Sequence, residues 1–88
     1  MKLSVYSLKN ILFQGEATSL NCKTVMGEIT VLDNHETLIT VLSAGVIKII
    51  VKEKNPSTGS GLREEFFPVT SGFLEVKSGN EVRVIVEQ

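Results

Sequence analysis

Cys22 and His35, the only cysteine and the only histidine of the chain, are the residues best suited to nucleophilic chemistry. A thiol becomes a strong nucleophile when a base within hydrogen-bond reach takes its proton. Nothing in the spacing of these two residues brings them into contact. We therefore interpret Cys22 as a small buried side chain of a strand and His35 as a turn residue. A zinc site is set aside, because zinc needs three or four ligands and carboxylates would have to complete the set.

Paired carboxylates offer a second possible chemistry, general acid–base catalysis. The candidate pairs are Asp33 with Glu36 and Glu64 with Glu65. Adjacent residues on a strand point to opposite faces, so Glu64 and Glu65 are not expected to converge. The first pair is expected to lie in a solvated turn. The glycine-containing segment 59–62 lacks the lysine and the following helix of a phosphate-binding loop. We predict no catalytic residue, no metal site and no cofactor.

Length and charge narrow the classes of function further. Eighty-eight residues are enough for one domain, which we assign to residues 1–88. Nine basic and ten acidic side chains give a net charge of −1, whereas nucleic-acid binding or a polybasic membrane contact requires a basic excess. A single cysteine favours a reducing compartment. No apolar stretch has the length of a signal peptide core or a membrane span, so we expect a cytoplasmic protein.

Alternating apolar and polar residues predict β-strands along most of the chain. Residues two apart point to the same face of a strand, and the apolar positions are rich in β-branched residues. The alternating runs are 3–5, 20–22, 29–31, 46–52, 74–76 and 82–86. Residues 38–44 could form a helix, but their short length, their composition and the following Gly45 favour a strand. Residues 55–61 are expected to form a loop between two strands. We predict an all-β fold, a two-sheet β-sandwich of roughly eight to ten short strands.

Several apolar residues are out of phase with the buried face of their strand. These residues are Val46, Ile50, Phe73 and Ile85. One interpretation is ordinary scattered surface residues, or curvature that buries parts of both faces. The other is a docking patch for a protein partner. The pattern leaves both interpretations open.

Three segments, in order, resemble the epsilon subunit of rotary ATP synthases. Residues 27–40 are similar to the family's Gly-Glu strand followed by a histidine-containing turn and a Leu-(Ile/Leu)-Thr segment. Residues 13–17 resemble its early Phe-x-Gly-x-Val, and residues 71–76 resemble its Ser-Gly-Gly-(Phe/Ile)-Leu-Glu-Val. The chain departs from the family at Thr37, where proline is usual, at residues 33–34, where Pro-Gly is frequent, and at Gly72, where two glycines are usual.

The resemblance implies a non-catalytic β-sandwich in the central stalk of the rotor, which couples proton flow to ATP synthesis. Its partners would be the gamma subunit and the c-ring, at the cytoplasmic face of the membrane, which it would meet only through the c-ring. The residues expected at the c-ring are Met26, Gly27 and Glu28. The residues expected at gamma are Ser7, His35 and Thr40, with Ile50 and Ile85 added from the strand pattern.

The family normally continues into a C-terminal helical hairpin, whereas this chain ends at Gln88. We therefore expect a sandwich without the hairpin, and the inhibitory and ATP-binding roles of that hairpin are not transferred. Two other classes stay open. One is a generic ligand- or protein-binding β-sandwich, and the other is a small hydrolase built on Cys22, His35 and a carboxylate.

Overall fold

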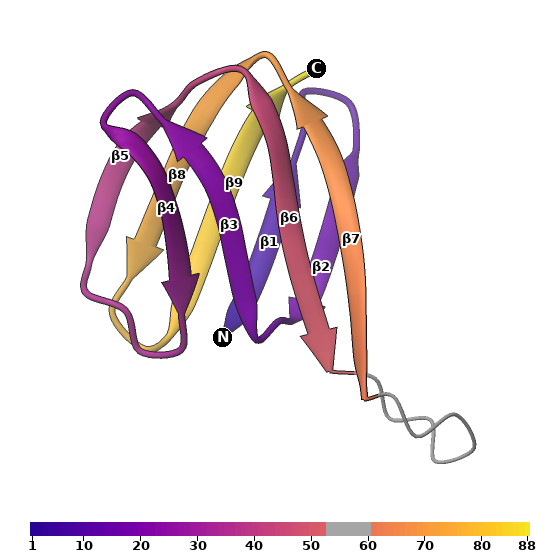
Figure 1. The fold of residues 1–88 in the computed structure, drawn as a ribbon, viewed down its shortest axis with the longest axis vertical. Helices are drawn as coiled ribbons and strands as arrows, with labels where there is room; N and C mark the ends of the chain where they lie inside the picture. Colours follow the sequence, from indigo (N-terminus) through magenta and orange to yellow (C-terminus); the bar gives the residue numbers. More distant parts are fainter. Residues whose placement is uncertain (53–60) are drawn as a thin grey trace.

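The computed structural model describes residues 1–52 and 61–88, and these form nine β-strands arranged in two layers (Figure 1). The strands are β1 (Lys2–Tyr6), β2 (Ile11–Glu16), β3 (Ser19–Thr24), β4 (Gly27–Leu32), β5 (Leu38–Leu42), β6 (Gly45–Lys52), β7 (Leu62–Val69), β8 (Ser71–Lys77) and β9 (Glu81–Glu87). The all-β prediction is confirmed, and residues 38–42 of the ambiguous segment form a strand. The loop predicted at residues 55–61 lies outside the described residues except for Gly61.

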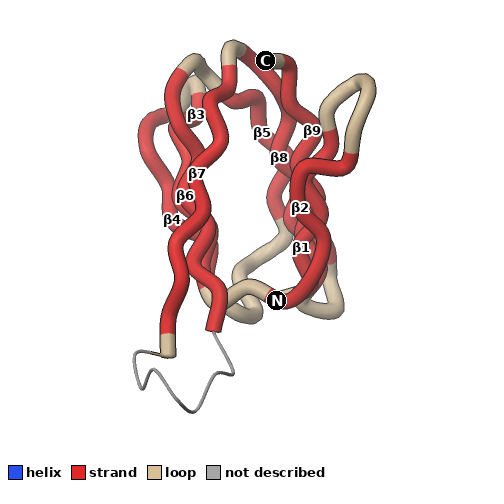
Figure 2. Tube along the Cα trace, turned by 90° about the vertical axis from the view of Figure 1, so that its right-hand side faces the viewer, coloured by secondary structure: helices blue, strands red, loops and turns tan. Residues whose placement is uncertain are grey.

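The strands form two layers that face each other (Figure 2). We call them the β9 layer, with the order β2-β1-β9-β8-β5, and the β6 layer, in which β3 lies between β4 and β6 and β7 follows β6. β1 and β9 pair in parallel, and the other neighbours pair antiparallel. The layers join where Thr24 of β3 pairs with Leu42 of β5. The predicted two-sheet sandwich is confirmed.

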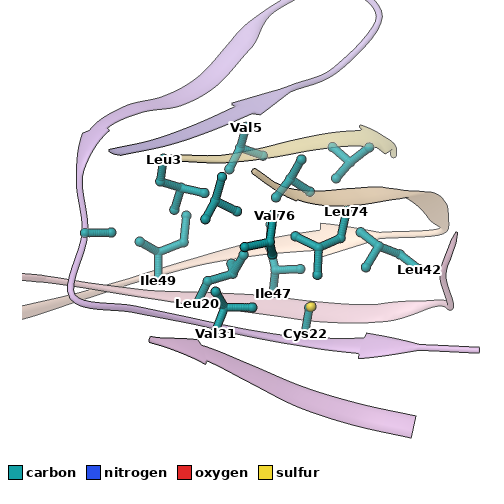
Figure 3. Packing of buried hydrophobic residues seen from close by; sticks show 14 of the residues in the cluster. Leu3, Val5, Leu20, Cys22, Val31, Leu42, Ile47, Ile49, Leu74 and Val76 are labelled. Atoms are coloured by element: carbon teal, nitrogen blue, oxygen red, sulfur yellow. The ribbon is translucent and has the colours of Figure 1, made fainter. Parts of the chain in front are cut away.

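The core lies between the two layers and is filled by alternate residues of the strands (Figure 3). Its largest fully buried side chains are Leu3, Val5, Leu20, Cys22, Val31, Ile47, Ile49, Leu74, Val82, Val84 and Val86. Because the side-chain period of a strand is two, the same alternation leaves the intervening residues on the outer faces. The position of Cys22 agrees with its interpretation as a buried strand residue.

The two ends of the sandwich carry different turns (Figure 1). The upper end holds the β1–β2 turn, residues 7–10, and the β3–β4 turn, residues 25–26. The lower end holds the N-terminus, the β4–β5 loop, residues 33–37, and the β8–β9 turn, residues 78–80. In the described parts of the chain, no helix has the length and apolar character needed to cross a membrane.

Candidate interaction surfaces

The structure does not bring Cys22 and His35 together. The Cys22 side chain faces the core and is 1% exposed, and burial raises the pKa of its thiol to about 11. A thiol with this pKa carries little thiolate near neutral pH, so it is a poor nucleophile. His35 lies in the exposed β4–β5 loop, where its Nδ1 is 2.9 Å from the carbonyl oxygen of Glu36. The arrangement needed for a Cys–His hydrolase is therefore not formed.

The carboxylate pairs do not converge either. Glu64 and Glu65 are consecutive residues of β7 and point to opposite faces, as predicted, and Glu65 pairs with Arg63 at 3.5 Å. Asp33 contacts the N-terminal ammonium group instead of Glu36. Within residues 1–52 and 61–88, no group of three or more His, Cys, Asp and Glu side chains is placed to hold a metal ion.

The β3–β4 turn presents an apolar tip at the upper end. Met26 is 87% exposed and lies at the end of this turn. The buried Thr24 fixes its shape, since its hydroxyl donates to the carbonyl of Gly27 at 2.7 Å and accepts the N–H of Met26 at 3.1 Å. Gly27 has φ 120°, which favours glycine. Glu28 follows and accepts a hydrogen bond from Asn21 Nδ2 at 3.3 Å. The three residues predicted for the c-ring thus form one exposed, well-supported tip.

The residues predicted for gamma are spread over the molecule. The Ser7 hydroxyl accepts the N–H of Asn10 at 3.1 Å in the β1–β2 turn, whereas His35 lies at the lower end. Thr40 is half-buried and points inward, in the same phase of β5 as the core residue Leu42. The remaining two, Ile50 and Ile85, lie on outer faces of different layers. These residues do not form one flat surface.

An apolar row crosses the outer face of the whole β9 layer. The row contains one outward-facing residue from each of β5, β8, β9, β1 and β2, and each residue pairs with the next one across adjacent strands. The row consists of Val41, Phe73, Ile85, Tyr6 and Ile11. Leu8 of the β1–β2 turn, together with Val41, Phe73 and Ile85, lines a groove of about 290 Å³ along it. Contiguous exposed apolar side chains of this kind indicate a protein-binding surface.

The outer face becomes mainly polar and charged toward the lower end. The next row along the same strands consists of Ile39, Glu75, Arg83, Ser4 and Gln14. The row below it alternates in charge and consists of Lys77, Glu81, Lys2 and Glu16. Glu75 and Lys77 also approach to 3.9 Å along β8. An apolar row with a polar border on one side can fix both the position and the orientation of a partner.

Only part of this surface is predictable from the sequence. Phe73 and Ile85 were recognisable because they are out of phase with the buried face of their own strands. Val41, Tyr6 and Ile11 become part of the row only through the strand order, in which β5 lies beside β8 and β1 beside β9. No local pattern in the sequence specifies those neighbours.

At the lower end, Asp33 is the centre of a polar cluster. Its carboxylate contacts the ammonium group of Met1 and accepts a hydrogen bond from Asn80 Nδ2 at 3.4 Å. The pKa of Asp33 lies below its usual value. The largest cause is the hydrogen bond from the N-terminal ammonium, followed by the hydrogen bond from Asn80 and then by the positive charge of the ammonium. The ammonium also donates to the carbonyl of Ala17 at 2.8 Å. The cluster connects β1 to the loop that follows β4.

Asp33→Asn should therefore change how stability depends on pH. A lowered pKa in the folded state stabilises the protein above the pKa of the unfolded state, about 4, and this stabilisation disappears as pH falls through the folded-state pKa. We expect the melting temperature of the variant to lie below that of the wild type at pH 5–7, and the difference to vanish once acidification protonates Asp33 in the folded state. Circular dichroism melts across this range measure it. A difference that does not change with pH would contradict the assignment, and Glu36→Gln, at an exposed position of the same loop, is the control.

Comparison with known proteins places the chain in a family. The family model described as "ATP synthase, Delta/Epsilon chain, beta-sandwich domain" matches residues 1–88. A similar protein is the ATP synthase epsilon chain of Persephonella marina, 33% identical over 86 residues, which are 98% of this chain and 57% of that protein. Another is the ATP synthase epsilon chain of Acinetobacter baumannii, 32% identical over 77 residues, which are 88% of this chain and 50% of that protein.

Solved structures show the same fold. A chain of the Tetrahymena thermophila mitochondrial ATP synthase central stalk/c-ring structure matches with a TM-score of 0.80 and 18% identity, over 100% of this chain and 63% of that one. A chain of the Euglena gracilis mitochondrial ATP synthase structure, which contains OSCP, F1 and the c-ring, matches with a TM-score of 0.83 and 18% identity, over 100% of this chain and 51% of that one. The chain spans about half the length of the curated relatives described above. It belongs to the delta/epsilon chain family of ATP synthase, and it corresponds to the β-sandwich domain of that family.

Proposed function

We propose that this chain is a non-catalytic central-stalk subunit of an F-type ATP synthase, which links the gamma subunit to the c-ring. In this role it couples proton flow to ATP synthesis, as a peripheral subunit at the cytoplasmic face of the membrane. The observation that carries the proposal is the family match over residues 1–88. The generic ligand-binding sandwich is not favoured, because it does not explain a family match of this extent.

The outer face of the β9 layer is the surface best suited to gamma. Its apolar row includes Ile85, and Ser7 lies in the β1–β2 turn at the upper end of this layer. His35 lies at the lower end, in the loop that enters this layer from β4 of the other layer. Thr40 lies on β5 of this layer but faces inward, so it would not contact gamma through this outer face. An interface commonly has an apolar centre with a polar rim, and this face has both. Ile50 lies on the other layer, so it would contact gamma only if gamma wraps around the sandwich.

The exposed tip at the upper end is the proposed contact with the c-ring. Met26 supplies apolar contact area and Glu28 supplies a charge, which contributes to register and association rate more than to affinity. The tip and the apolar row are carried by one close-packed core, and such an interior deforms little under load. Torque applied by the c-ring at the tip would therefore reach gamma through the core without slip.

Met26→Asp tests the proposed tip. The substitution places a charge where apolar contact is expected, so we expect at least a roughly tenfold loss of ATP-driven proton pumping in membranes that contain the variant complex. Leu62→Asp is the matched control, because Leu62 is an exposed apolar residue at the start of β7, away from the tip and from the His35 loop. Both variants should bind gamma normally in solution. Normal pumping by Met26→Asp, or equal loss in both variants, would exclude the tip as the c-ring contact.

A further inference from the structure

The side chain of Asn80 connects the β4–β5 loop to the rest of the lower end. Its Oδ1 accepts the N–H of Asn34 at 2.8 Å, and its Nδ2 donates to Asp33 Oδ1 at 3.4 Å. These bonds join residues 46 and 47 positions apart in the sequence. Residues 32–37 are all exposed, so no buried side chain of this segment anchors it to the core. The position of His35 therefore depends on a small number of polar contacts.

The backbone around Asn80 is itself fixed. Its carbonyl accepts the N–H of Lys2 at 2.9 Å, which attaches the β8–β9 turn to β1. Asn80 has φ 59° and Asn34 has φ 60°, both in the left-handed region that asparagine tolerates better than most residues. Asparagine at position 80 thus meets two requirements, the backbone conformation of the turn and the two side-chain bonds to the loop.

We propose that Asn80 is a positioning residue, which holds the His35 loop in the conformation that meets gamma. The inference rests on the proposed function through the expected contact between His35 and gamma. Asn80 contacts the loop and β1, and it is not a member of the apolar row. Without its side chain the loop would be less ordered in the free protein, and binding would then include the cost of ordering it.

Asn80→Gly is the most direct test, because glycine adopts the left-handed conformation without strain and removes both side-chain bonds. We expect amide hydrogen exchange of Asn34 and His35 to become at least about tenfold faster, with exchange in the strands unchanged. We expect the affinity for purified gamma to fall by roughly three- to tenfold. Ser78→Ala, at an exposed position of the same turn, should change neither quantity.

Swapping the side chains at positions 33 and 80 distinguishes a positioning role of Asn80 from a general effect on stability. Asn80→Asp alone places two carboxylates side by side. Amide hydrogen exchange in the β4–β5 loop should therefore be at least as fast in this variant as in Asn80→Gly. In Asp33→Asn/Asn80→Asp the amide and the carboxylate exchange places, and both hydrogen bonds can form again. We expect this double variant to recover slow exchange at Asn34 and most of the affinity for gamma.

The outcomes distinguish the inference from the function on which it rests. Unchanged exchange at Asn34 in Asn80→Gly would overturn the positioning role. Faster exchange with unchanged affinity for gamma would show that the loop conformation does not matter for binding, and would also overturn the inference. If wild-type chain does not bind gamma, the proposed function fails, while the exchange experiment still decides whether Asn80 holds the loop.

Discussion

Gly72→Ala is expected to destabilise the sandwich by about 3 kcal/mol or more, a large part of the roughly 5–15 kcal/mol typical of a folded domain. A Cβ atom at this position would lie 2.3 Å from the carbonyl oxygen of Ile85 and 3.1 Å from the Cα of Val86. Both are backbone atoms of the neighbouring strand β9, so no side-chain rotation relieves the overlap. Relief requires β8 and β9 to separate, in the middle of the β9 layer.

Thermal melts followed by circular dichroism measure this effect. For a domain of this size, 3 kcal/mol corresponds to a fall in melting temperature of roughly 12–24 °C. Gly45→Ala is the matched control, since its nearest neighbour would be the Lys23 Cδ atom at 3.0 Å, near the end of a flexible side chain that can move. We expect the control to lie within about 1 kcal/mol of the wild type. A wild-type melting temperature for Gly72→Ala would mean that the two strands do not approach as closely as the structure shows.

Gly72 also illustrates which structural features the sequence can predict. Alternation of residue types was enough to locate strands and the buried face, because both depend on neighbours two positions apart. The sequence indicated a single glycine where the family usually has two, but it did not indicate that the carbonyl of Ile85 lies against it. That contact depends on the register of β8 with β9, which pairs Gly72 with Val86. Registers between strands are set by packing of the whole sandwich.

The candidate surfaces likewise differ in whether local sequence patterns or the packing of distant segments determine them. The β3–β4 tip is local, so the positions around Met26 were predictable from one turn signal and the resemblance. The grouping of Ile50 with Ile85 was a prediction from strand pattern alone, and such a pattern identifies outward residues without saying to which layer they belong. The link from Asn80 to the β4–β5 loop joins distant segments, and no local pattern indicates it.

Phe73→Asp is expected to weaken binding to gamma by roughly 100-fold, which corresponds to about 2.7 kcal/mol. Phe73 lies on β8 within the apolar row, where it pairs with Val41 on one side and Ile85 on the other. Aromatic residues surrounded by other apolar residues commonly contribute most to the affinity of an interface. A carboxylate at this position would be desolvated on binding without a partner, which adds to the loss of contact area.

Phe66→Asp is a closely matched control for this experiment. Phe66 is 56% exposed and Phe73 is 57% exposed, and both lie on outer faces, one on each layer. Because both side chains are directed outward, both variants should fold, and circular dichroism melts verify this. Affinity for purified gamma, measured by isothermal titration calorimetry, should fall for Phe73→Asp only.

If Phe66→Asp weakens binding instead, gamma contacts the β6 layer, which carries Ile50, and the assignment of the β9 layer is wrong. If both variants weaken it equally, gamma encloses the sandwich, and the apolar row is only one part of a larger interface.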